Sequence, residues 1–163
     1  MPPQKVTPAG TERFVARSSR EQPGTWELSG IIDEHADLSF FAALNGPIRL
    51  NLRQVKRINS HGVRSWLEGI RKVPGGAAVE FVECSPAIID QANMVAGFLG
   101  RGIVASFFVP ILCARCGYEH DELFFTEDYT RDGHLPSVSC PRCATTLKLD
   151  ELESNYLLFA RGK

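Results

Sequence analysis

The 163-residue chain lacks a long apolar run, an N-terminal leader pattern and an excess of either charge. No apolar run approaches the roughly 18 residues that a membrane-spanning helix needs. The opening residues, Met1–Pro8, lack the apolar core of a signal peptide. A net charge of −1 gives no general basic field that would attract nucleic acid. We therefore expect a soluble cytoplasmic protein with no membrane association.

The sequence also shows nothing that resembles a catalytic triad, a glycine-rich phosphate loop or a metal site with an open coordination position. We therefore predict that the protein is not an enzyme. No internal repeat and no low-complexity segment is present.

What the sequence does contain is enough apolar material, 44% of its residues, for a packed core. Its length allows one α/β domain and a small appendage. We divide it into a flexible tail at residues 1–12, an α/β domain at residues 13–110 and a cysteine-bearing unit at residues 111–163. The last unit is the acidic one, because residues 110–163 hold 6 Lys/Arg and 9 Asp/Glu.

Apolar periodicity and turn residues predict strands that alternate with helices in the first unit. The expected strands are Phe14–Ala16, Trp26–Ile32, Ile48–Leu52, Ala78–Glu83 and Ile103–Val109, and the expected helices are Leu38–Leu44, Val63–Val73 and Pro86–Val95. The first two strands should form a hairpin. Strands separated by helices predict a mixed, largely parallel sheet with helices on at least one face.

The segment Ile48–Ile70 is central to this domain. Its pattern predicts a buried strand, a loop and an amphipathic helix. The helix begins at Asn59-Ser60-His61-Gly62. A hydroxyl or amide there can accept bonds from free backbone N–H groups. The same groups and the helix dipole favour a phosphate. Ser60 is therefore placed where a helix cap and a phosphorylation site look alike, with Arg57 and Arg64 nearby in the sequence.

The second unit carries four cysteines in two Cys-x-x-Cys pairs. Two such pairs can close one tetrahedral site. They predict structural Zn²⁺ bound by Cys113, Cys116, Cys140 and Cys143. Iron or four free thiols are the alternatives. The fifth cysteine, Cys84, follows a core strand and is expected to be a buried thiol.

Around the cysteines we expect a strand at Leu123–Phe125, an acidic loop through Gly133 and a returning strand at Thr145–Leu149. A last helix, capped by Asp150, should align Leu152, Tyr156 and Phe159 on one stripe. Zinc ribbons can bind nucleic acid, and a ribbon-containing transcription-associated protein is the alternative reading. The acidic balance of the unit opposes it, because four thiolates on one Zn²⁺ add negative charge. We expect no nucleic-acid partner.

Residues Phe14–Val109 together resemble a STAS domain, the fold of anti-sigma-factor antagonists. Three segments carry the resemblance: Gly30-Ile31-Ile32-Asp33, the stretch from Leu50 to Val63 with Asn59-Ser60-His61-Gly62, and Phe81–Ile88 with its Ser-Pro helix start. The resemblance covers about two-thirds of the chain and does not extend to the cysteine unit.

The resemblance implies a regulatory interaction module that binds a kinase or anti-sigma-type protein. In that family, the serine aligned with Ser60 is phosphorylated by the partner, and phosphorylation releases the complex. The aligned acidic residue is Asn59 in this chain. The implied partner-binding residues are Asp33, Asn59, Ser60, His61, Gly62 and Arg64.

Overall fold

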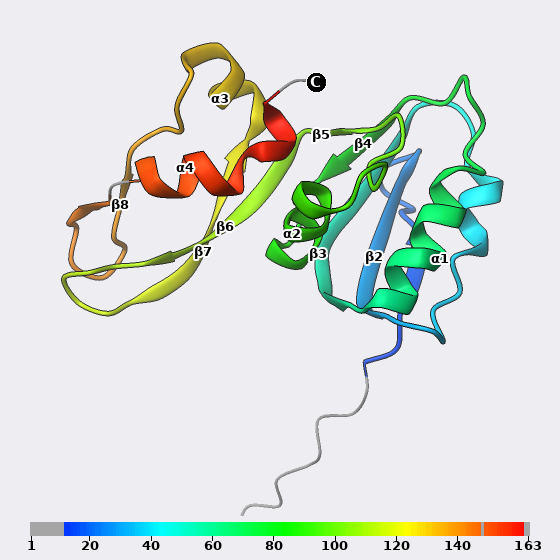
Figure 1. Ribbon diagram of the computed structural model, residues 1–163, viewed down its shortest axis with the longest axis horizontal. Coiled ribbons are helices and arrows are strands. Elements are labelled where there is room, and N and C mark those ends of the chain that lie inside the picture. The colour runs from blue at the N-terminus through cyan, green and yellow to red at the C-terminus, as the bar shows by residue number, and fades with distance from the viewer. Residues whose placement is uncertain (1–11, 148, 162–163) are drawn as a thin grey trace, which may run out of the picture.

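The computed structural model describes residues 12–147 and 149–161, arranged as two units that lie side by side (Figure 1). The first contains β1 (Val15–Ser18), β2 (Thr25–Ile32), η1 (Ser39–Ala43), β3 (Ile48–Ile58), α1 (Ser60–Ile70), β4 (Val79–Val82), α2 (Pro86–Met94) and β5 (Ile103–Val104). The second contains β6 (Ser106–Leu112), β7 (Glu119–Phe125), α3 (Thr126–Asp132), β8 (Val138–Ser139), β9 (Thr146–Leu147), α4 (Asp150–Tyr156) and η2 (Leu158–Ala160).

The first unit is a mixed α/β fold around a five-stranded sheet with strand order β1-β2-β3-β4-β5. Strand β1 is antiparallel to β2, as the predicted hairpin requires, and the remaining pairs are parallel. Alternation along β3 buries Leu50 and Leu52 and exposes Arg49 to the other face. The prediction of a mixed, largely parallel sheet is confirmed.

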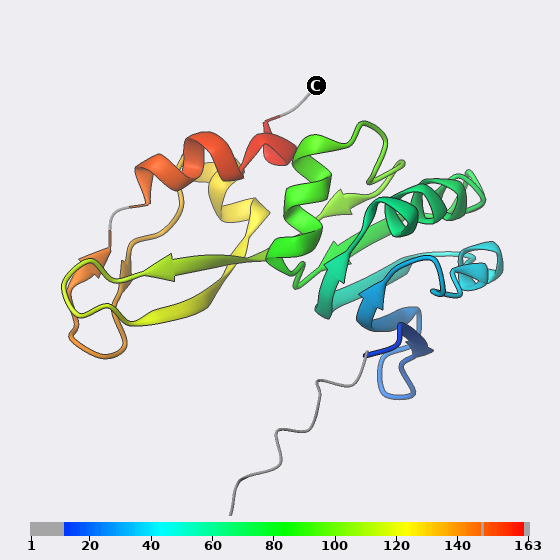
Figure 2. The ribbon, with the colours of Figure 1, turned by 60° about the horizontal axis from the view of Figure 1, so that its bottom comes forward.

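Helices α1 and α2 lie on the same face of this sheet, the face that receives the buried side chains (Figure 2). Trp66 of α1 is fully buried and its ring stacks on Phe98 at 5.1 Å between centroids. Its indole Nε1–H donates to the carbonyl oxygen of Phe98 at 2.8 Å, so the one polar atom of the ring is satisfied. Phe41 meets the ring edge-on at 5.0 Å. The opposite face of the sheet carries no helix of the described chain.

The predicted strand Ile103–Val109 is wrong in one respect, since the structure breaks it at Ala105. Ile103–Val104 pairs with β4 in the first unit, whereas β6 leaves that sheet and pairs along its whole length with β7. Pro110, the residue directly after the predicted strand, lies inside β6. Proline is tolerated there because β6 pairs only with β7 at this position, its bonds to Cys84 on the other side lying nearer its start. One stretch of extended chain thus belongs to both units.

The second unit has more regular structure than predicted. Strand β7 is longer than Leu123–Phe125, and the expected acidic loop contains α3, which ends at Gly133 in the left-handed conformation. The strand predicted at Thr145–Leu149 is shorter in the structure, where β9 covers only Thr146–Leu147. Leu149 occupies the N-cap position of α4, so the cap predicted at Asp150 is wrong. The side chain of Leu152 and residues 1–11 of the tail predicted at residues 1–12 lie outside the described residues.

The two units share one hydrophobic core. Phe107 of β6 is fully buried, and its ring contacts those of Tyr156 and Phe159 at 6.4 and 5.2 Å between centroids. Tyr156 donates its hydroxyl to the carbonyl oxygen of Phe108 at 2.7 Å. Tyr156 and Phe159 thus pack inward, as the predicted stripe requires. None of the helices within the described residues is long and apolar enough to cross a membrane.

Candidate functional site

The four paired cysteines converge on one point, with all their Sγ atoms within 4.8 Å of one another. Cys113 and Cys143 lie 3.6 Å apart between sulfur atoms, and Cys116 and Cys140 are separated by the same distance. No disulfide joins them. A tetrahedron of thiolates at the usual metal–sulfur distance has edges of about 3.8 Å. The cluster therefore has the size and the ligand number for a tetrahedral metal ion.

Two equivalent turns build this cluster. In the first, Gly117 N–H donates to the Cys113 carbonyl and Cys113 N–H to Tyr118. In the second, Ala144 N–H donates to the Cys140 carbonyl and Cys140 N–H to Thr145. All four bonds measure 2.8 or 2.9 Å. The residue after each second cysteine has positive φ, 70° at Gly117 and 59° at Ala144. Each Cys-x-x-Cys pair is therefore held in the same tight turn with both sulfurs on one side.

The surroundings shift the ionisation of these thiols in opposite directions. The pKa of Cys143 is lowered to about 6, because the Thr145 side chain and backbone N–H both reach its sulfur, with Oγ1 3.3 Å away. At Cys116, a backbone bond from Tyr118 favours the thiolate, but desolvation and the neighbouring sulfurs outweigh it and raise the pKa to about 12. A cation at the centre would attract all four sulfurs and stabilise each of them as a thiolate.

The turn at Ser60 is the second candidate site, and its capping residue is Asn59. Asn59 Oδ1 accepts from the Gly62 N–H at 2.8 Å, the bond expected of an N-cap. Ser60 is the first residue of α1 and is exposed. Its hydroxyl makes no hydrogen bond with the described residues. The capping reading of Ser60 is therefore wrong, and the hydroxyl points to solvent at a helix N-terminus.

Asn59 also ties this turn to the loop that follows β2. Its Nδ2 donates to Glu34 Oε2 at 3.0 Å. A bond from its own backbone N–H, followed by the bond from Asn59, lowers the pKa of Glu34. His35 and His61 add favourable charge interactions. A carboxylate thus lies beside the turn, although the position aligned with the acid of the STAS pattern is an amide.

Gly62 explains how closely α1 approaches the end of β2. A Cβ at this position would lie 2.1 Å from the carbonyl oxygen of Ile32. That carbonyl also accepts from the Asn59 N–H at 3.1 Å. Because only glycine leaves room for this contact, α1 can begin directly against the end of β2.

The structure thus brings the loop of Asp33 next to Asn59 and Gly62, while Ser60 and His61 stay exposed beside it. Asp33 stabilises its own loop, since Oδ1 accepts from the His35 N–H at 2.9 Å. Arg64 lies one helical turn further along α1 and is exposed. Glu34 was missed by sequence reasoning. Its only signal was its place directly after Gly30-Ile31-Ile32-Asp33.

Comparisons of the chain with protein-family models, with curated proteins and with solved structures found no match.

Proposed function

We propose that this protein is a regulatory interaction module of the STAS type. It binds a kinase or anti-sigma-type protein through the turn at Ser60, and phosphorylation of Ser60 releases that partner. The observation that carries the proposal is the exposed Ser60 hydroxyl at the first position of α1, which is left unbonded because Asn59 makes the cap.

The chemistry of the turn supports a phosphate at this position. The N-terminus of an 11-residue helix offers free N–H groups and a favourable dipole to an anion. Arg57 and Arg64, both exposed, lie near the turn in sequence. Phosphorylation adds roughly −1.5 to −2 charges, which repel an acidic partner and are costly to desolvate at a dry interface. The same groups can bind an acidic partner surface before modification.

The arrangement of the first unit also fits a STAS domain, with an antiparallel first strand, four parallel strands and two helices on one sheet face. The three segments that carry the sequence resemblance lie at the end of β2, at the β3–α1 turn and at the β4–α2 turn. The first two meet at the contact between Gly62 and Ile32. This convergence supports a shared binding surface.

The test is a pull-down from lysate of the source cell with wild type and two variants side by side. Ser60→Asp should weaken capture of the partner by at least roughly tenfold, about 1.4 kcal/mol. Ser60→Ala should bind as wild type does, because no cap is lost. Circular dichroism should show all three folded. Equal affinities of wild type and Ser60→Asp for the same partner would contradict the proposed switch and leave the turn with a structural role only.

We further infer that the four-cysteine cluster holds a structural Zn²⁺. A closed set of four thiolates leaves no position for a reacting water, which favours structure over catalysis. The unit at residues 110–163 has a formal excess of three acidic residues before any thiolate is counted, from 9 Asp/Glu against 6 Lys/Arg. That charge favours a protein partner over nucleic acid for this unit. Iron would give the same sulfur geometry, and elemental analysis distinguishes the two.

A further inference from the structure

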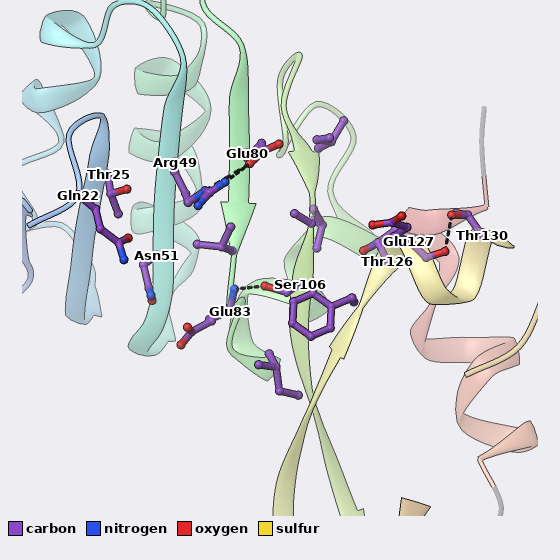
Figure 3. Close-up of a pocket in the computed structure, with 16 residues that line it drawn as sticks. Gln22, Thr25, Arg49, Asn51, Glu80, Glu83, Ser106, Thr126, Glu127 and Thr130 are labelled. Carbon is purple, nitrogen blue, oxygen red and sulfur yellow. Dashed lines mark hydrogen bonds and ion pairs between the residues drawn. The ribbon is translucent and has the colours of Figure 1, made fainter. Parts of the chain in front are cut away.

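A cleft of about 760 Å³ lies between the uncovered face of the five-stranded sheet and the second unit (Figure 3). One wall carries Thr25, Arg49 and Asn51, and the other carries Thr126 and Glu127 at the start of α3. Glu80 and Glu83 lie between them. The volume is within the range of small-molecule sites. Because both units supply walls, this cleft exists only in the assembled chain.

Negative charge dominates the cleft. Among its lining residues are the carboxylates of Glu80, Glu83 and Glu127 and a single cation, Arg49. Arg49 is occupied, since its Nε and Nη2 both donate to Glu80 Oε2, at 3.3 and 3.1 Å. Glu83 has an ion-pair partner outside the lining, Arg53, at 3.5 Å. The Glu127 carboxylate has no ion pair among the described residues.

The same cleft also contains exposed apolar side chains. Ile103 and Phe125 are 61% and 52% exposed, and both line it. Single exposed apolar side chains are common, whereas these two line the same cleft. The lining therefore combines the unpaired carboxylate of Glu127 with two exposed apolar side chains, one of them aromatic.

We propose that this cleft binds a small organic cation, an amine attached to an apolar body. The ammonium group would pair with Glu127, in a lining that also holds Glu80 and Glu83, and the body would cover Phe125 and Ile103. An anion would meet three carboxylates whose only cation in the lining is already paired. The inference is independent of the Ser60 turn, because α1 lies on the opposite face of the sheet.

Three indole probes with one ring system and different charges test the proposal on the full-length protein. Titrations followed by calorimetry should show saturable binding of tryptamine, at least tenfold weaker binding of the neutral alcohol tryptophol, and no binding of indole-3-acetate. Equal affinities for tryptamine and tryptophol would overturn the assignment of a cation. The absence of saturable tryptamine binding would overturn the site.

Variants then locate the contact. Glu127→Gln should weaken tryptamine binding at least tenfold, and Phe125→Ala should weaken all binding; neither should change the melting temperature, because both residues lie at the surface of the cleft. Arg49→Gln should strengthen tryptamine binding severalfold, because it removes the like charge and frees Glu80. Glu68→Gln on α1 is the matched control and should leave binding unchanged. Identical effects of Glu127→Gln and Glu68→Gln would overturn the proposed position.

Discussion

The side chain of Asn93 in α2 holds the backbone of Tyr156 at the end of α4, with Nδ2 donating to its carbonyl oxygen at 2.8 Å. Its Oδ1 accepts from the Phe159 N–H, also at 2.8 Å. One amide thus satisfies a carbonyl where α4 ends and an N–H in η2. A helix of the first unit thereby fixes the C-terminal segment of the second.

Asn93→Ala should therefore lower the free energy of unfolding by about 2 kcal/mol, since two partly buried backbone groups lose their partner. Urea unfolding measures the loss. Hydrogen exchange should show faster exchange at Phe159 than in wild type. Asn45→Ala, at an exposed asparagine, is the control and should change neither quantity. An unchanged exchange rate at Phe159 would mean that packing alone holds the segment.

Removal of the proposed Zn²⁺ should unfold the cysteine-bearing end of the second unit, which includes β8 and β9, while the first unit keeps its structure. The reason is that the two turns at Cys113 and Cys140 have few apolar contacts of their own and depend on the metal. Chelator treatment followed by hydrogen exchange should show lost protection in β8 and β9 and retained protection in β3 and α1. Cys113→Ser should abolish metal content by elemental analysis. Cys84→Ser should retain one ion per chain.

The positive φ angles after the cysteine pairs predict opposite effects of two exchanges. Ala144 has φ 59°, a conformation that costs a residue with a Cβ roughly 1 kcal/mol relative to glycine. Ala144→Gly should therefore slow the loss of metal to a chelator. Gly117→Ala should hasten it, although a Cβ at Gly117 meets no atom within 4 Å. Equal release rates from both variants would show that these turns relax when the metal is bound.

The sequence predicted the sheet, the α1 face and the cysteine cluster because each has a regular pattern. Alternation marks Leu50 and Leu52, and helical spacing marks Trp66 and Ile70. The break at Ala105 has no such pattern. It arises where the Ala105 N–H donates to the Phe81 carbonyl in the first unit and the Ala105 carbonyl accepts from Thr126 in the second.

Helix α3 was missed for a different reason. None of its residues is buried, so it has no apolar stripe that periodicity could detect. Ion pairs of Arg131 with Asp128 and Asp132 and a left-handed Gly133 define it instead. The contact between Glu34 and Asn59 depends on two segments 25 residues apart. Only the three-dimensional arrangement reveals such a pair.

Cys84 should resist alkylation in the native protein. It is fully buried, and desolvation raises the pKa of its thiol well above the ordinary value, so the reactive thiolate is absent at neutral and mildly alkaline pH. Treatment with iodoacetamide under mildly alkaline conditions, followed by mass spectrometry, should leave Cys84 unmodified until urea unfolds the first unit. Native labelling at a rate similar to that of free cysteine would contradict the burial.

Asn59→Asp would place an acid where the STAS pattern has one, but the structure predicts that it also creates a repulsion. The new carboxylate would keep the cap on Gly62 and would face Glu34, whose oxygen now lies 3.0 Å from the Asn59 amide nitrogen. Two facing carboxylates disfavour each other's ionisation, so their pKa values rise on folding. A carboxyl group whose pKa is raised in the folded state stabilises the protein at low pH. The protein loses this stabilisation as the pH rises through that pKa.

Asn59→Asp should therefore unfold at a lower urea concentration than wild type at about pH 7, and the difference should shrink near pH 4, where the carboxylates begin to take up protons. Adding Glu34→Gln should restore the midpoint at neutral pH, because the new amide can donate to the introduced carboxylate in place of the lost bond. Measuring Glu34→Gln alone completes a double-mutant cycle between residues 34 and 59. Additive effects of the two changes would show that residues 34 and 59 do not interact in solution. Coupled effects would make Glu34 the group that decides whether an acid is tolerated beside Ser60.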